Sequence, residues 1–450
     1  MIRALPAAAS LCVLTVSAAA AQEIAVEWSA EHRTRYQSLS GQFRNGLPGS
    51  DQALTLRTLL AGEASSGRFS IGGEFQDSRS YFDDEGSATN SNIVNAAEIL
   101  QAYVAVDASG LGGADEARLT VGRQTIQIGS GRIVGRNGFR NAINAFTGAF
   151  WEWEKGDAAW KAFFTAPIER RPLGLEDVVD NVIQIDKESE DALFWGVFHS
   201  RSDLPHGVTG EIFYYGFDDS PEDPRPEQTL HTPGFRIFTA PAVNRLDFEV
   251  EGMVQLGSIE TVQLPTSVLT EQDVFAQYAH FEAGFTYDAR FSPRVSIVYD
   301  FASGDSDPTD NEFGRFNGLF SPVAGDFGPT DIYTPFGREN LSSPGLKIEA
   351  KDGSRSSGFI RYRAFFLDEP ADAWVRGFIQ DPNGGSGDLI GHQADARVRY
   401  SPIPGRLRFE AGGAVLARGP YAIDTADGGF APEAPDPVSY YSYFDAVLSF

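Results

Sequence analysis

The sequence has 450 residues, with 62 Asp and Glu against 36 Lys and Arg, so its formal net charge is −26. A chain this acidic is not expected to bind nucleic acid, which requires a basic surface. The composition, with 47 Gly, 25 Pro, 12% aromatic residues and only 2 Met, favours many short strands and turns over helices.

The first 21 residues have the three parts of a secretory signal peptide. Arg3 provides the positive charge, Leu5 to Val16 form the apolar segment, and Ala19 to Ala21 are the small residues before the expected cleavage site. Cys12, the only cysteine, lies inside this peptide and is removed with it. The mature chain, residues 22–450, therefore has no thiol for a disulfide, a cysteine zinc site or a nucleophile.

Alternation of apolar and polar residues predicts β-strands along most of the mature chain. No stretch reaches 18 consecutive apolar residues, which excludes a membrane-spanning helix. About 18 strands are expected in total. The clearest segments cover residues 23–37, 53–63, 69–75, 97–107, 145–153, 160–166, 192–199, 208–217, 246–256, 275–287, 295–301, 358–366, 389–400, 407–416 and 440–450, with one more strand around Leu119, Val121 and Arg123.

The segments between the predicted strands alternate between short turns and long acidic loops. The longest irregular region covers residues 305–338, and shorter acidic loops cover 77–95, 169–191 and 218–228. This alternation is typical of outer-membrane barrels, which have short periplasmic turns and long outer loops. A propeller is disfavoured because no 20–50-residue repeat is visible. A sandwich would need about nine strands per sheet, whereas a closed barrel leaves no unpaired edge. The sequence predicts an all-β transmembrane antiparallel barrel over residues 22–450.

Several segments resemble the alginate export family of outer-membrane porins. They are Val121-Gly122-Arg123-Gln124 and residues 131–135, 300–320, 339–341 and 391–395, and the aromatic last strand ending at Phe450 resembles the assembly signal of outer-membrane barrels. The resemblance implies a monomeric 18-stranded barrel in the outer membrane of a Gram-negative bacterium, in contact with lipid and lipopolysaccharide and inserted by the barrel assembly machinery. It also implies a lumen narrowed by loops and lined by arginines, and passive export of an anionic polysaccharide such as alginate.

Arginines are the candidate site residues, because a guanidinium binds a carboxylate through two parallel hydrogen bonds and never loses its charge. Strand alternation directs one set of arginines into the lumen. The stretch from Arg118 to Trp151, which is rich in arginine, adds further candidates. In the alternative interpretation these arginines only pair with acidic neighbours such as Glu27, Glu31 and Glu63 and fill the lumen. The predicted solute path comprises Arg33, Arg35, Arg57, Arg123, Arg132, Arg136, Arg361, Arg363, Asp395, Arg397 and Arg399.

Two details of the arginine-rich stretch from Arg118 to Trp151 are less simple. Arg123 shares its strand face with residues that point toward lipid, where an arginine near the bilayer midplane costs about 2–4 kcal/mol. Either a β-bulge at Gly122 turns Arg123 into the lumen, or Arg123 lies near a membrane interface. Glycine in a strand often marks a bulge, which favours the lumen. The spacing of Arg132, Arg136 and Arg140 also fits a helical turn in an outer loop.

Signals for catalysis or for a cofactor are weak. The six histidines are scattered without ligand spacing, and Asp305 to Asp310 lacks the glycine of a calcium loop. No nucleophile elbow is present. We therefore predict a passive channel for anionic solutes, most simply an exporter of an anionic polysaccharide, with no metal and no cofactor. The alternatives are a porin for uptake of small carboxylates or other nutrients and, from carboxylate pairs such as Glu249 and Glu251, a barrel-embedded hydrolase.

Overall fold

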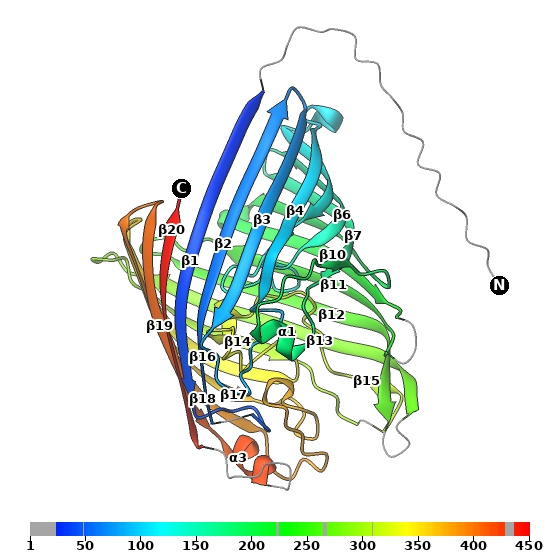
Figure 1. The fold of residues 1–450 in the computed structure, drawn as a ribbon, viewed down its shortest axis with the longest axis vertical. Coiled ribbons are helices and arrows are strands. Elements are labelled where there is room, and N and C mark those ends of the chain that lie inside the picture. The colour runs from blue at the N-terminus through cyan, green and yellow to red at the C-terminus, as the bar shows by residue number, and fades with distance from the viewer. Residues whose placement is uncertain (1–23, 48, 222–224, 264–267, 308, 428–435) are drawn as a thin grey trace, which may run out of the picture.

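The computed structural model describes residues 24–47, 49–221, 225–263, 268–307, 309–427 and 436–450. The predicted signal peptide, residues 1–21, lies outside this part of the chain. Almost all of the regular structure is β-strand (Figure 1). The strands are β1 Ala25–Ser40, β2 Ser50–Ser66, β3 Phe69–Tyr81, β4 Asn95–Asp107, β5 Glu116–Gln124, β6 Phe146–Lys155, β7 Ala158–Glu169, β8 Lys187–Glu188, β9 Ala192–Leu204, β10 Val208–Asp219, β11 Gln228–Thr239, β12 Leu246–Gln263, β13 Val268–Thr286, β14 Arg294–Ala302, β15 Glu312–Phe313, β16 Leu341–Asp352, β17 Ser356–Phe366, β18 Leu389–Ile403, β19 Leu407–Arg418 and β20 Val438–Ser449.

The helices of the described residues are short and lie between strands. They are α1 Leu175–Val179, α2 Ala324–Phe327, α3 Pro420–Asp427 and the 3₁₀ turns η1 Leu111–Gly113, η2 Pro205–Gly207 and η3 Val375–Gly377. None of them is long and apolar enough to cross a membrane.

The long strands form one closed antiparallel barrel. Each pairs with its neighbour along the chain, and β1 closes the ring by pairing with both β2 and β20. At the closure, Phe450 and Ala30 exchange two backbone hydrogen bonds of 2.9 and 3.2 Å. Of the twenty strands in the sheet, β8 and β15 have only two residues each and extend no wall. The prediction of an 18-stranded antiparallel barrel is confirmed.

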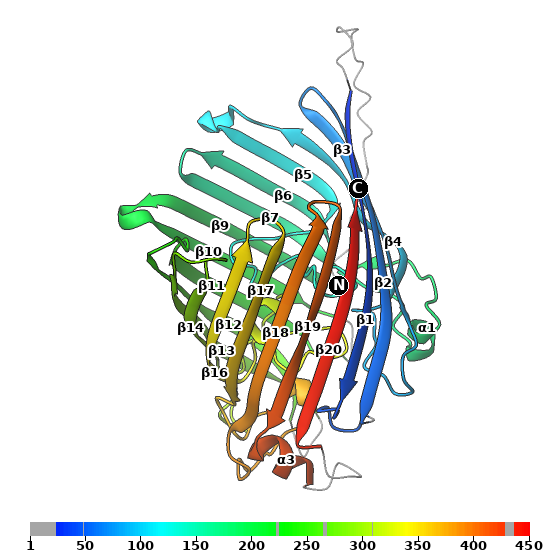
Figure 2. The ribbon, with the colours of Figure 1, turned by 90° about the vertical axis from the view of Figure 1, so that its left-hand side faces the viewer.

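The two ends of the barrel differ in the length of their connections. The end that carries the C-terminus has tight turns such as 67–68, 156–157 and 353–355, and the opposite end carries the long segments 125–145 and 303–340 (Figure 1). Figure 2 shows the wall formed by β16–β20 and β1–β2. Along β1, Arg33 and Arg35 are buried inside while Trp28 is exposed outside, as the predicted alternation requires.

Two strands of the wall, β11 and β16, were not among the strands predicted from the sequence. Each contains a Pro-Gly pair, Pro233-Gly234 and Pro344-Gly345, which on sequence grounds signals a turn. Here both pairs lie inside a strand. The ladders to β12 and β17 have no paired residues at the two prolines, because proline has no N–H to donate.

The long segments 125–145 and 303–340 fold into the barrel and pack against the inner side of its wall. Phe320 packs against Phe146 and Phe194 of the β6–β9 wall, with ring centroids 4.9 and 5.0 Å apart. These rings belong to a buried apolar cluster that continues over β10 to β13. No helix forms over residues 132–140, so the helical turn predicted from the arginine spacing is wrong. A space with a polar lining is left beside β1, β2 and β16–β20.

Candidate functional site

A cavity of about 730 Å³ lies inside the barrel beside β1, β2 and β16–β20, and we call it the inner cavity. Ten basic and six acidic side chains line it. The basic residues are Arg33, Arg35, Arg57, Arg132, Arg136, Arg338, Lys347, Arg397, Arg399 and Arg408, and the acidic residues are Glu31, Asp326, Glu349, Asp395, Glu410 and Asp445. The lining of the inner cavity therefore carries a net positive charge, although the whole chain carries a net charge of −26. A confined positive lining of this kind raises the local concentration of anions.

Arginines of β1 and β2 hold the segment 138–141 inside the barrel. Arg33 donates to the carbonyl oxygen of Phe139 at 2.7 Å and to the Asn141 side chain at 3.0 Å. Arg57 donates to the carbonyl oxygens of Gly138 and Arg140 at 3.0 and 2.9 Å. Three of these acceptors are neutral backbone carbonyls. Arg57 also pairs with Glu31 at 2.9 Å, whereas Arg33 has no ion pair with a described residue.

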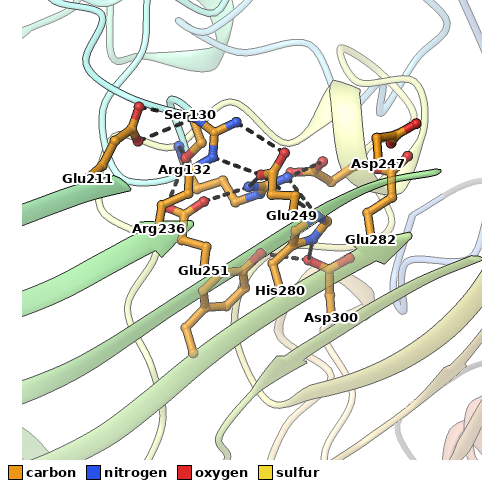
Figure 3. A network of polar contacts seen from close by, with 12 residues as sticks. Ser130, Arg132, Glu211, Arg236, Asp247, Glu249, Glu251, His280, Glu282 and Asp300 are labelled. Atoms are coloured by element: carbon orange, nitrogen blue, oxygen red, sulfur yellow. Dashed lines mark hydrogen bonds and ion pairs between the residues drawn. The ribbon is translucent and has the colours of Figure 1, made fainter. Parts of the chain in front are cut away.

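Arg132, in the segment 125–145, contacts the opposite wall through several carboxylates (Figure 3). Its Nη1 contacts Glu249 and Glu251 of β12, and its Nε donates to Asp326 at 3.2 Å. Its Nη2 lies 3.0 Å from His280 Nε2. One buried guanidinium therefore joins an inserted segment to the wall and to α2.

Arg361 and Arg363 extend from β17 to α2 and hold α2 against the barrel wall. Arg361 forms a bidentate pair with Asp395, both distances being 3.0 Å, and donates to the carbonyl oxygens of residues 325 and 326. Arg363 pairs with Asp300 at 2.7 Å. Both arginines are almost fully buried, and neither lines the inner cavity.

The structure thus divides the predicted site residues into three groups. Arg361 and Arg363 contact α2 without lining the inner cavity, and Arg123 lies at the end of β5, away from this cavity. The residues that line the inner cavity together are Arg33, Arg35, Arg57, Arg132, Arg136, Asp395, Arg397 and Arg399.

Arg123 lies at the end of β5 and pairs with Glu98 at 2.6 Å. The bulge predicted at Gly122 is wrong, because the ladders on both sides of β5 are continuous there. The register shift lies instead in β4, where Leu100 is the extra residue opposite β3. Gly122 has φ +131°, and a Cβ atom there would lie 2.4 Å from the Ala102 carbonyl oxygen. Close strand packing therefore requires this glycine.

A second cavity, of about 560 Å³, lies nearer the end with the long loops, and we call it the outer cavity. Four arginines and one acidic residue line it: Arg44, Arg140, Arg170, Arg376 and Asp331. Asn137 lines both cavities and so marks where they meet. None of these four arginines was among the predicted site residues, because all lie outside the strands, where alternation gives no direction.

The segment 170–191 is fastened near Arg123 by a buried carboxyl group. Asp186 accepts hydrogen bonds from Arg171 N at 2.7 Å and Asn95 Nδ2 at 2.8 Å, while its own N–H donates to Glu98 at 2.7 Å. Burial and the charge of Glu98 raise the pKa of Asp186 to about 6, although the Arg171 N–H and Arg123 oppose the shift.

This raised pKa predicts a pH-dependent segment. Asp186 holds its proton more tightly when the segment 170–191 is packed in place than when the segment is detached. The packed segment therefore loses stability as pH rises from about 4 to about 6. Hydrogen exchange in residues 180–188, corrected for the intrinsic pH dependence of exchange, should be faster at pH 7 than at pH 4.5. Asp186→Asn should abolish the difference. An equal difference in that variant would contradict the assignment.

The described residues contain no cluster of three or more His, Asp or Glu side chains with metal-site geometry. In the acidic segment 305–310, Asp305 accepts a hydrogen bond from Gly314 N at 3.3 Å, and Asp307 accepts two from Thr309. These carboxylates are used within their own loops.

Solved outer-membrane structures share the fold at low sequence identity. OccK8 (OprE) of Pseudomonas aeruginosa superimposes with a TM-score of 0.59 at 10% identity, covering 94% of this chain and 98% of that chain. OpdK of the same organism, solved with vanillate, gives 0.56 at 10% identity, covering 94% and 98%. OccK11 (OpdR), also from Pseudomonas aeruginosa, gives 0.54 at 14% identity, covering 94% and 96%.

The sequence itself identifies the family. No curated protein sequence matches the chain. The family model for alginate export matches residues 25–428, which is nearly the whole of the barrel. The resemblance seen in the sequence motifs is thereby confirmed, and both the family and the fold are those of outer-membrane channels, not of enzymes. The protein belongs to the alginate export family.

Proposed function

We propose that this outer-membrane channel is passive and favours anionic solutes that carry carboxylates. The observation that supports this most directly is the excess of basic side chains around the inner cavity. Arg397 and Arg408 line it without an ion pair to any described residue, and Arg397 instead stacks 4.9 Å from the Phe359 ring. Unpaired guanidinium groups in a confined, poorly screened space attract carboxylates and can bind them bidentately.

Small carboxylates fit the geometry better than a polymer does. The interior is divided into two cavities that meet at Asn137, and the adjoining segment 138–141 is fixed by Arg33 and Arg57. A polysaccharide would need one continuous passage, and hence displacement of that segment. Vanillate, present in one OpdK structure, is itself a small carboxylate. The family description favours export of an anionic polysaccharide, which is the second candidate.

The same proposal places the chain as a monomer in the outer membrane of a Gram-negative bacterium, in contact with lipid and lipopolysaccharide. Its last strand, β20, has the exposed apolar residues Tyr440, Phe444 and Leu448 on its outer face and is followed by the exposed Phe450. This is the type of terminal strand that the barrel assembly machinery is expected to bind.

Reversal potentials in planar bilayers with a KCl gradient test the charge preference. We expect chloride to be several-fold more permeant than potassium at low salt, with the preference falling toward 1 M, where the Debye length is about 3 Å. Cation selectivity under these conditions would contradict the proposal.

Adding oligouronates and monomeric uronates in turn separates the two candidate substrates. Current block by monomers alone supports small carboxylates. Current block by oligouronates whose duration increases with the length of the oligomer supports passage of a polysaccharide.

A further inference from the structure

The outer cavity contains two neighbouring guanidinium groups that share one acceptor. Arg140, from the segment 125–145, and Arg170, which follows β7, both donate to Oδ1 of Asn144, Arg170 at a distance of 2.7 Å. The remaining contacts of the two side chains are also to neutral groups, the carbonyl oxygen of Ala142 and the side chain of Asn92. The Nε of Arg170 is buried and has no hydrogen-bond partner.

Neither arginine forms an ion pair with a carboxylate of the described chain, whereas Arg35 and Arg132 of the inner cavity do. Arg35 has two carboxylate partners and Arg132 has three. Burial lowers the pKa of Arg170 to about 10, and burial together with the charge of Arg170 lowers the pKa of Arg140. Two like charges held this close are destabilising unless an anion lies between them.

Besides Arg44, Arg376, Asp331 and seven apolar residues, the outer cavity is lined by amide and hydroxyl groups. They come from the loops 82–94 and 125–145 and from the segment 319–334: Ser87, Thr89, Asn90, Asn92, Asn137, Asn144, Ser321, Thr330 and Thr334. The Oδ1 of Asn137 and the Oγ1 of Thr330 are buried without a partner. Groups of this kind can both donate to and accept from the hydroxyl groups of a ligand.

We propose that the outer cavity is a binding site for a single hydroxylated carboxylic acid, such as one sugar acid. In this site Arg140 and Arg170 bind the carboxylate, and the surrounding amides and hydroxyls bind its hydroxyl groups. The inference rests on the proposed function and deepens it, because it names the ligand class and the residues that select it before the solute reaches the inner cavity.

The position of the site fits a role in selection. A ligand held by Arg140 and Arg170 lies on the side of Asn137 that faces the long loops, and Asn137 is the shared boundary with the inner cavity. Release past Asn137 would bring the carboxylate toward Arg33 and Arg57, whose guanidinium groups already border the segment 138–141. The two cavities would then bind the same chemical group in succession.

Isothermal titration of the detergent-purified protein with three probes tests the ligand class. Glucuronate carries both a carboxylate and hydroxyl groups, glucose lacks the carboxylate, and cyclohexanecarboxylate lacks the hydroxyls. Each missing set removes hydrogen bonds between ligand and protein, so glucuronate should bind at least about tenfold more tightly than either of the others. Equal affinity for all three would overturn the proposal.

Arg140→Gln and Arg170→Gln test the residues. Each should weaken glucuronate binding by about tenfold or more and leave glucose binding unchanged. Arg201→Gln is the matched control, because Arg201 pairs with Asp203 on the exposed surface near a tight turn at the opposite end of the barrel and should have no effect. Unchanged glucuronate binding in both Arg140 and Arg170 variants would overturn the assignment.

Two different results would contradict the anion preference of the channel and the binding site in the outer cavity. If the wild-type channel showed no anion preference in bilayers, the proposed function would fail. If it preferred anions but the Arg140 and Arg170 variants bound glucuronate like the wild type, only the outer site would fail.

Discussion

Replacing Arg35 by Met is expected to loosen the barrel and to widen its passage. Arg35 binds Asp445 of β20 in a bidentate pair, at 2.6 and 2.7 Å, and Asp331 of the segment 303–340 at 2.8 Å. Its Nη1 also donates to the carbonyl oxygen of Phe139 at 3.0 Å. One side chain thus joins the closing strands to both inserted segments. Its removal leaves two buried carboxylates unpaired, at a cost of about 3–5 kcal/mol.

Two measurements check this expectation. The temperature at which the folded barrel loses its compact mobility in SDS electrophoresis should fall, and single-channel conductance should rise as the segment around Phe139 is released. In the triple variant with Asp331→Asn and Asp445→Asn, most of the lost stability should return because no unpaired charge is left, while conductance stays high. Arg201→Met, in an exposed ion pair, should change neither. Wild-type conductance in Arg35→Met would show that Arg35 does not hold the segment.

The barrel could be predicted from the sequence because membrane strands must alternate. Lipid outside and a polar interior impose this period of two, so the faces of β1 and the strand count were predicted correctly. Alternation of apolar and polar residues does not identify a strand that contains residues typical of turns. In β16 the Pro344-Gly345 pair, a combination typical of turns, lies inside the wall, where a Cβ at Gly345 would lie 2.6 Å from Cγ of Arg363.

The site could be predicted only in part for the same reason. Arg33 and Arg57 lie on regular strands, so their inward direction follows from the alternation. Arg140 and Arg170 lie in irregular segments, and their meeting at Asn144 depends on how these segments fold inside the barrel. No local pattern contains that information. A spacing of four residues suggested a helical turn around Arg136, but the segment is held by contacts with the wall and not by its own backbone.

Replacing Arg132 by Gln is expected to shift the channel from anion preference toward cation preference. Arg132 lines the inner cavity and compensates Glu249, Glu251 and Asp326. Without it, Arg236 still pairs with Glu249 and Arg338 with Asp326, but Glu251 keeps only the hydroxyl of Ser130, at 2.9 Å. The change in reversal potential should be larger at 0.1 M salt, where charges act over about 10 Å, than at 1 M.

Two further variants separate the charge of Arg132 from its structural contacts. Arg132→Gln combined with Glu249→Gln and Glu251→Gln loses the same contacts but leaves the network one unit more positive than the wild type, so anion preference should return. Arg236→Gln removes an equal charge next to Glu249 from a side chain that does not line the inner cavity, and should shift selectivity less. Equal shifts in the Arg132 and Arg236 variants would mean that selectivity follows the total charge of the interior. A persistent loss of anion preference in the triple variant would mean that Arg132 acts by holding the inserted segment in place.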